Sequence, residues 1–204
     1  MGKDKLAVDP AASALNNYKL LIGSVVPRPI AFVSTVSSAG VFNLAPFSFF
    51  NAVCAEPPIL TFAAGHRMPE KDTLANVRAT GEFVVNVVTE EIAERMNLCS
   101  GEYPAGVSEF EISDLTPVAS DLVRAPLVLE SPLNMECRVV QILDLSTKPR
   151  GGSLVIGEVI RFHVDQAITE EMRIDPEKLR AIGRMGGDLY TRTRDRFAMA
   201  RPKV

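Results

Sequence analysis

Residues 43–51 read Asn-Leu-Ala-Pro-Phe-Ser-Phe-Phe-Asn and follow a strand-like run that ends in a Ser-Ser-Ala-Gly turn. A Phe-rich apolar run ordinarily forms a core strand, but this one is interrupted by Pro46, Ser48 and two asparagines. Proline cannot donate to a β-ladder, which disfavours a central sheet position for Pro46. The pattern predicts a semi-irregular segment in which backbone amides, one hydroxyl and amide side chains lie between aromatic faces. Such groups suit a flat heterocycle with a polar edge.

The strand signals predict a mainly β fold. Runs rich in β-branched and aromatic residues, bounded by turn residues, indicate strands. They lie at residues 30–36, 59–63, 82–88, 133–145 and 153–165. In the last run, alternate apolar residues from Leu154 to Val164 predict one hydrophobic face, as in a barrel strand. Glu158 interrupts that face, and it is compatible with a bulge, a buried ion pair or an interface.

The helix signals lie between and after the strands. Gly81 should stop a helix over residues 70–80, Thr89 is a suitable N-cap for a second, and Asp175-Pro176 predicts a third that ends near Gly183. Residues 101–126 are expected to form a long excursion with short elements at most. Since the strands cluster without strict βαβ alternation, we expect an antiparallel barrel with peripheral helices.

Composition limits the classes of function. A chain of 204 residues with 47% hydrophobic residues is expected to form a single domain over residues 1–204, with an N-terminal arm (1–17) and a C-terminal tail (183–204). The net charge of −3 disfavours nucleic-acid binding, and no apolar run is long enough to span a membrane. Three scattered cysteines favour the cytoplasm. The two histidines and the lack of metal or hydrolase motifs predict no metal site.

Five motifs occur in an order that resembles a known family. They are residues 28–36, the turn at Gly40, and residues 43–51, 56–59 and 71–76. Together they are similar to the flavin reductase-like family of FMN-binding split barrels, which includes flavoredoxin. The resemblance spans roughly residues 20–165, and the Gly-Arg-Met-Gly-Gly run at 183–187 with Tyr190 is similar to one branch. It implies an FMN-binding split β-barrel.

Lys71, Asp72 and Thr73 open the first predicted helix, where free amides and the positive dipole end favour an anion. His66 and Arg67 lie just upstream. The segment alone is more often an ordinary polar helix start. The resemblance implies instead that these residues hold the flavin phosphate, with Asp72 turned toward a backbone amide or a ribityl hydroxyl.

The same resemblance places the flavin ring against the segment that opened this section. Amides of Ser48, Phe49 and Phe50 are expected at the polar edge of the ring, Asn51 at a ring carbonyl and Thr35 at the ribityl chain. Asn43, Ala45 and Pro46 complete the expected cofactor site. At least two of the three Phe residues in this segment are expected to be core.

Three further residues have either a functional or a structural interpretation. His163 is expected either to contact nicotinamide as a catalytic residue or to be structural, as a lone histidine more often is. Arg184 and Tyr190 are expected either to line the flavin site or to lie in a flexible tail. The glycine run there is not a Rossmann fingerprint, because it follows a helix.

The resemblance implies a NAD(P)H-dependent flavin reductase that transfers hydride to flavin N5, with NADH or NADPH as donor. A small open barrel cannot enclose a whole flavin, so a homodimer with the flavin near the interface is expected. A flavin-dependent monooxygenase is one possible electron acceptor. A non-catalytic FMN electron carrier and an oxidase related to the pyridoxamine phosphate oxidases remain alternatives. The nicotinamide preference, the acceptor, and whether flavin is substrate or prosthetic group stay open.

Overall fold

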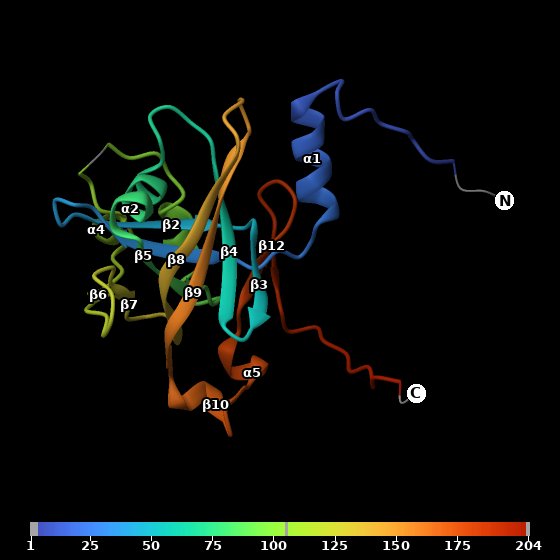
Figure 1. Cartoon of the computed structure of the whole chain (residues 1–204). Helices are drawn as coiled ribbons and strands as arrows, with labels where there is room; N and C mark the ends of the chain where they lie inside the picture. Colours follow the sequence, from blue (N-terminus) through green and yellow to red (C-terminus); the bar gives the residue numbers. More distant parts are fainter. Residues whose placement is uncertain (1–3, 105, 203–204) are drawn as a thin grey trace.

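Seven strands form one antiparallel sheet in the order β2-β1-β5-β8-β9-β4-β3 (Figure 1). The structure is a computed structural model that describes residues 4–104 and 106–202. The sheet confirms the expected mainly β fold. The strands are β1 (Ala31–Val36), β2 (Phe42–Phe47), β3 (Phe50–Ala55), β4 (Pro58–Gly65), β5 (Glu82–Val87), β8 (Leu133–Ser146) and β9 (Gly152–Val164).

The chain closes this sheet into a barrel at Ser48 and Phe49. β2 and β3 stand at opposite ends of the strand order, yet only these two residues separate them along the chain. The amide of Ala63 on β4 donates to the Phe49 carbonyl at 2.8 Å, which extends the β3–β4 pairing to the break. The expected irregularity of residues 43–51 is therefore confined to two residues. Pro46 lies in β2, at the end of the strand order, where a missing amide is tolerated.

The barrel interior is filled by a core that α2 (Asp72–Thr80) completes with Leu74 and Val77. Gly81 ends this helix in the left-handed conformation, with φ of 68°, as the sequence predicts. Phe62 and Phe83 pack edge to face with centroids 5.3 Å apart. A Cβ atom at Gly157 would lie 2.4 Å from Phe83 Cζ, so a glycine is needed on β9 for this ring to fit.

A second apolar cluster covers the outer side of β1 and β2. It joins Phe32 and Leu44 of the strands to Met96 of α3 (Ala93–Leu98), Phe110 of α4 (Glu109–Ser113) and Ile182 of β12 (Ile182–Arg184). The other elements are short: β6 (Pro117–Val118), β7 (Leu127–Val128), η1 (Gln166–Ile168), β10 (Thr169–Glu170), β11 (Arg173–Ile174), α5 (Pro176–Leu179) and β13 (Tyr190–Arg192). The expectation of short elements in residues 101–126 is confirmed for the described residues.

Two helix boundaries differ from the predictions. Thr89 does not cap α3, which starts at Ala93; it forms a bridge with Ala181 instead. Asp175 does cap α5 by accepting from the Glu177 amide at 2.8 Å, but the helix ends at Leu179 and the chain turns into β12. Pairing of β12 with β13 and with the Arg28 backbone explains this early end.

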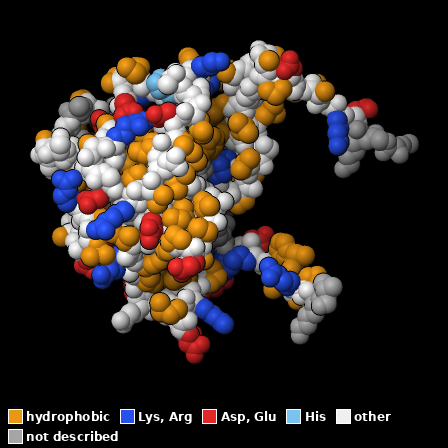
Figure 2. Space-filling model, in the orientation of Figure 1, with side chains coloured by type: hydrophobic (Ala, Val, Ile, Leu, Met, Phe, Trp, Pro, Cys, Tyr) orange, Lys and Arg blue, Asp and Glu red, His pale blue; other side chains and the backbone are white. Residues whose placement is uncertain are grey.

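The predicted apolar face of β9 points away from the barrel interior. The fully buried side of the strand carries Ser153, Val155 and Val159, whereas Phe162 on the other side is 53% exposed. Glu158 is half-buried on this outer face, so it is not a core residue. Figure 2 shows apolar side chains gathered over β8, β9 and β4. Exposed apolar residues of the sheet strands are Val53, Val140, Leu143, Leu145 and Phe162.

The two ends of the chain extend away from the barrel (Figure 1). The expected N-terminal arm (1–17) includes only the first residues of α1 (Ala14–Ser24), a helix in which every side chain is exposed or half-exposed. Residues 1–3 of the arm and 203–204 of the tail lie outside the described residues. Near the start of the tail, Arg192 and Arg194 pair with Glu90 at 3.0 and 2.5 Å. Within residues 4–104 and 106–202, no helix combines the length and apolarity needed to cross a membrane.

Candidate functional site

Two adjoining cavities lie where the chain passes from β2 to β3. The smaller, of about 80 Å³, lies by the start of α2, and the larger, of about 400 Å³, lies between α1, α3 and the β12–β13 hairpin. Pro46 and Ser100 line both, so the two spaces are neighbours. Together they form an elongated site with one narrow end and one broad end.

The narrow end carries two cations, Arg67 and Lys71. Arg67 Nη1 lies 3.2 Å from Glu102 Oε1, while its Nε is buried without a hydrogen-bond partner among the described residues. Burial lowers the pKa of Lys71, and the charge of Arg67 lowers it further. Lys71 also stands at the N-cap of α2, where free amides and the helix dipole attract an anion. This end of the site therefore has the donors and the charge for one phosphate group.

A buried hydrogen-bond network supports the narrow end from behind. Asn43 Oδ1 accepts from Thr73 Oγ1 at 2.7 Å and from Thr35 Oγ1 at 3.3 Å. Asn76 Nδ2 donates to the same Thr35 hydroxyl at 3.0 Å. Because Thr35 is fully buried and bonded on both sides, its hydroxyl is directed into this network. The network joins β1, β2 and α2, and so fixes the start of the helix relative to the barrel.

Glu109 completes this network from α4. Its Oε2 accepts from Asn43 Nδ2 at 2.8 Å and from the Leu44 amide at 2.9 Å. Burial raises the pKa of Glu109, and the two hydrogen bonds oppose that shift. Asp72 lines the narrow cavity beside Lys71, as does Ala45. Of the polar residues expected at the site, Asn43, Arg67, Lys71, Asp72 and Thr73 line the narrow cavity, and Thr35 lies behind it.

The broad end is built around Arg28, a residue not among those expected to form the site. Its guanidinium donates to the carbonyls of Ile22, Val25 and Met185 at 2.7, 2.7 and 2.9 Å. Nε lies 3.4 Å from Ser48 Oγ, and the guanidinium carbon lies 5.9 Å from the Phe49 ring centroid. A single buried side chain thereby joins α1, the barrel seam and the C-terminal hairpin.

Of the three Phe residues of the segment, only Phe49 lines the broad cavity. It is 45% exposed, whereas Phe47 is 7% exposed in the barrel core and Phe50 packs against that core. The expectation that at least two of the three are core is confirmed. Ser48 and Pro46 line the same wall as Phe49. The broad end therefore offers one aromatic face beside polar groups of the chain.

The C-terminal hairpin also lines the broad cavity. Arg184 and Tyr190 both line the broad cavity, and the guanidinium carbon lies 4.4 Å from the Tyr190 ring centroid. Arg184 Nη2 donates to the Gly187 carbonyl at 2.6 Å, and Tyr190 Oη donates to Asn97 Oδ1 at 3.1 Å. This hairpin is folded against the barrel, so the alternative of a flexible stretch does not apply to it.

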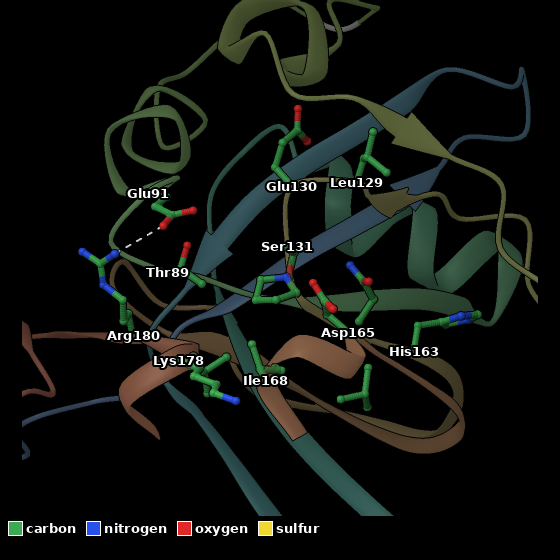
Figure 3. A pocket seen from close by; sticks show the side chains of 14 residues that line it. Thr89, Glu91, Leu129, Glu130, Ser131, His163, Asp165, Ile168, Lys178 and Arg180 are labelled. Atoms are coloured by element: carbon green, nitrogen blue, oxygen red, sulfur yellow. Dashed lines mark hydrogen bonds and ion pairs between the residues drawn. The ribbon is translucent and has the colours of Figure 1, made fainter. Parts of the chain in front are cut away.

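Some expected site residues lie elsewhere. Phe50, Asn51 and His66 are not among the residues that line the two cavities in the described structure. Asn51 is exposed on β3, and the His66 amide donates to the Gly151 carbonyl at 2.8 Å. His163 lines a separate cavity of about 540 Å³ with Asp165 and Arg180 (Figure 3). The structure therefore does not place His163 at the barrel seam.

His163 belongs instead to a cluster around Glu136, which is completely buried. Glu136 Oε1 accepts from the Asp121 amide at 2.9 Å and lies 2.6 Å from His163 Nε2, while Oε2 accepts from the Leu122 and Val123 amides at 2.6 and 3.0 Å. Burial acts to raise the pKa of Glu136, but these hydrogen bonds lower it below its usual value. Since each oxygen already has two partners, this carboxylate anchors the 121–123 loop.

Comparison with known proteins gives consistent matches along the chain. The family model described as flavin reductase like domain matches residues 22–183. An uncharacterized protein of Halalkalibacterium halodurans is 41% identical over 199 residues, covering 94% of each chain. Nitrilotriacetate monooxygenase component B from Bacillus cereus has a TM-score of 0.93 at 37% identity, covering 97% of this chain and 100% of that chain. Pseudomonas fluorescens 2-nitrobenzoate 2-nitroreductase NbaA has a TM-score of 0.88 at 34% identity, covering 97% and 96%.

Proposed function

The chain belongs to the flavin reductase like family and has the split-barrel fold, and on this premise we propose that it binds FMN and catalyses hydride transfer from NADH or NADPH to flavin N5. The observation that carries the proposal is the elongated site at the barrel seam. Its narrow end carries Arg67 and Lys71, and its broad end is lined by Phe49 and Tyr190.

The residues fit a flavin mononucleotide. A buried Arg67 Nε without a partner in the described chain needs an acceptor, and a phosphate supplies one. The broad cavity has an aromatic face and polar groups, as binding sites for flat heterocycles commonly do. FMN is proposed rather than FAD because the narrow end is sized for one phosphate.

The protein's part in this reaction is to bind and orient the flavin. The flavin supplies the redox chemistry, so the chain needs no catalytic triad. We assign Arg67, Lys71 and the start of α2 to the phosphate, and Ser48, Phe49, Arg184 and Tyr190 to the ring. Thr35, Asn43 and Thr73 act as positioning residues, because their hydrogen bonds hold α2 against β1 and β2.

We also propose a homodimer in which the flavin lies near the subunit interface. The outward apolar face of β9 and the exposed side chains of α1 support it, since large exposed apolar patches mark interaction sites. α1 supplies Tyr18 and Ile22 to the broad cavity, so this surface adjoins the site. A flavin-dependent monooxygenase component is a fitting acceptor, given the similarity to component B of such a system. The cytoplasm is the proposed location.

Absorbance and rapid kinetics test the proposal. The purified protein should be yellow or should bind added FMN more tightly than FAD in a fluorescence titration. Stopped-flow mixing of the FMN-loaded protein with NADH, and separately with NADPH, should bleach the flavin absorbance. A protein that binds FMN without bleaching by either donor would be an electron carrier instead of a reductase. A protein that binds neither flavin would refute the assignment of the site.

A further inference from the structure

Arg28 is a buried cation whose charge is not cancelled by a carboxylate. It is 5% exposed, and none of the ion pairs among the described residues includes it. Buried arginines are rare unless they are paired with an acid. The three carbonyls accept from three of the five N–H groups of Arg28 and leave its net charge in place.

A second cation faces the same space. Arg184 lines the broad cavity with Arg28, and the only hydrogen bond of its side chain within the described residues is to the Gly187 carbonyl. Burial lowers the pKa of Arg28, and the charge of Arg184 lowers it further. The other ionisable residues that line this cavity are Tyr18, Tyr190 and the exposed Asp188. The positive charges of Arg28 and Arg184 are thus held near each other despite their repulsion. Neither residue lines the narrow cavity, where the phosphate is proposed to bind.

We infer that Arg28 and Arg184 form a cationic wall that makes the broad cavity bind anionic, two-electron-reduced flavin more tightly than neutral oxidised flavin. The inference rests on the proposed function, which puts the flavin ring in this cavity. Reduction adds negative charge to the ring at neutral pH, and fixed positive charges in a partly desolvated site favour the form that carries it. Arg28 and Arg184 are therefore positioning residues that set the relative affinity for reduced and oxidised flavin. The repulsion between the two cations is offset when the anionic flavin is bound.

Arg184→Met is the main test, because Arg28 also ties three segments of the fold. Oxidised FMN affinity is measured by fluorescence, and the midpoint potential of bound FMN by equilibration with a reference dye. Loss of one charge-assisted interaction should reduce the preference for reduced flavin roughly tenfold to a hundredfold. That change corresponds to a potential lower by about 30–60 mV for a two-electron couple. Arg184→Lys, which keeps the charge, should restore most of the difference.

Two further variants control the interpretation. Arg192→Met removes a cation from the same hairpin but outside the broad cavity, where Arg192 pairs with Glu90, and the potential should stay at the wild-type value. Asp188→Asn removes the acid that lines the cavity and should raise the potential. This variant decides the question if Arg184→Met no longer holds FMN. Wild-type potentials in the Arg184→Met or Asp188→Asn proteins would refute the inference. Absence of flavin binding by the wild-type protein would refute the proposed function instead.

Discussion

Replacing Lys71 with alanine should weaken FMN binding and leave riboflavin binding almost unchanged. Lys71 lines the narrow cavity at the N-cap of α2, beside Arg67, and is not among the residues that line the broad cavity. A charge-assisted hydrogen bond contributes about 1.5–3 kcal/mol. Since about 1.4 kcal/mol corresponds to one decade, the Kd for FMN should rise roughly tenfold to a hundredfold. Riboflavin has no phosphate, so it does not use this contact.

Flavin fluorescence titration measures both affinities on the same protein. Lys178→Ala is the matched control, because Lys178 is an exposed lysine of α5 that lines the separate cavity with His163. It should bind both flavins like the wild type. Because the pKa of Lys71 is lowered, wild-type FMN affinity should also begin to fall at a pH below the usual lysine pKa of about 10.4, and the alanine variant should lack this step.

Two results would contradict this reasoning. Equal losses for FMN and riboflavin in the Lys71→Ala protein would mean that Lys71 supports the fold of the site, and that the phosphate binds elsewhere. No loss for either flavin would mean that Arg67 and the amides of α2 suffice. Thermal denaturation without ligand separates the first result from simple unfolding, because a half-exposed lysine that lacks a hydrogen-bond partner among the described residues should not change the melting temperature.

Three other predictions concern the thiols, the buried carboxylate and the oligomer. The triple alanine variant of the cysteines should keep NAD(P)H-dependent flavin reduction, because burial raises the pKa of Cys99 to about 11 and that of Cys137 still further; a folded variant that binds flavin but cannot reduce it would require a redox-active thiol. Glu136→Ala should lower the free energy of unfolding in urea by about 3–5 kcal/mol, as the loss of a buried charged partner does. The pKa of Glu136 is lowered in the fold, so its stabilisation is present above the unfolded glutamate pKa of about 4.3 and is lost as the pH falls through the folded value; the difference between the two proteins should shrink in acid. Phe162→Asp should convert the proposed dimer to a monomer in light scattering, whereas Met172→Asp, at a 91% exposed position outside the apolar face, should not; a dimeric Phe162→Asp protein would place the interface elsewhere.

The sequence predicts the strands well because their signals are local. Alternation and turn residues locate β1, β4, β5, β8 and β9, and Gly81 marks the end of α2 where it occurs. Alternation did not show which face of β9 is buried, because the more apolar parity faces outward, while the buried side carries Ser153 and Gly157 beside Val155 and Val159. The glycine at position 157 carried the signal, since a strand makes room for a ring such as Phe83 only on its core side.

Only part of the site was predicted from the sequence, because only some of its residues are close together along the chain. Lys71 and Arg67 are close in sequence, so a motif brings them together. Arg28 and Arg184 are brought together by folding alone, through the pairing of their backbones. Arg28 is the first residue of the first matching motif and directly precedes a buried strand. This position was the sequence signal that could have identified Arg28 as a site residue. The cap expected at Thr89 was wrong because a tertiary bridge to Ala181 took precedence over local propensity.

Thr35 shows a further limit. Hydroxyl groups on strands near an expected ligand are natural candidates for contact, but the sequence does not show which neighbours compete for them. In the structure the Thr35 hydroxyl is hydrogen-bonded to Asn43 and Asn76. His163 is similar, because the buried Glu136 that holds it lies 27 residues away along the chain. The case of Thr35 depends on the packing of α2 against β1, and that of His163 on the pairing of β8 with β9; local patterns encode neither contact.

The seam at Ser48 and Phe49 also limits how such a protein can diversify. These two residues close the barrel and line the site at once, so a change there alters ring binding and strand closure together. Selection for a new electron donor or acceptor would therefore act through pieces outside the closed sheet. α1 and the hairpin of β12 and β13 are such pieces, because they line the broad cavity without belonging to the seven-stranded sheet. Related chains should thus vary most in these two elements while the seam stays constant, and a transplanted hairpin should carry donor preference from one relative to another.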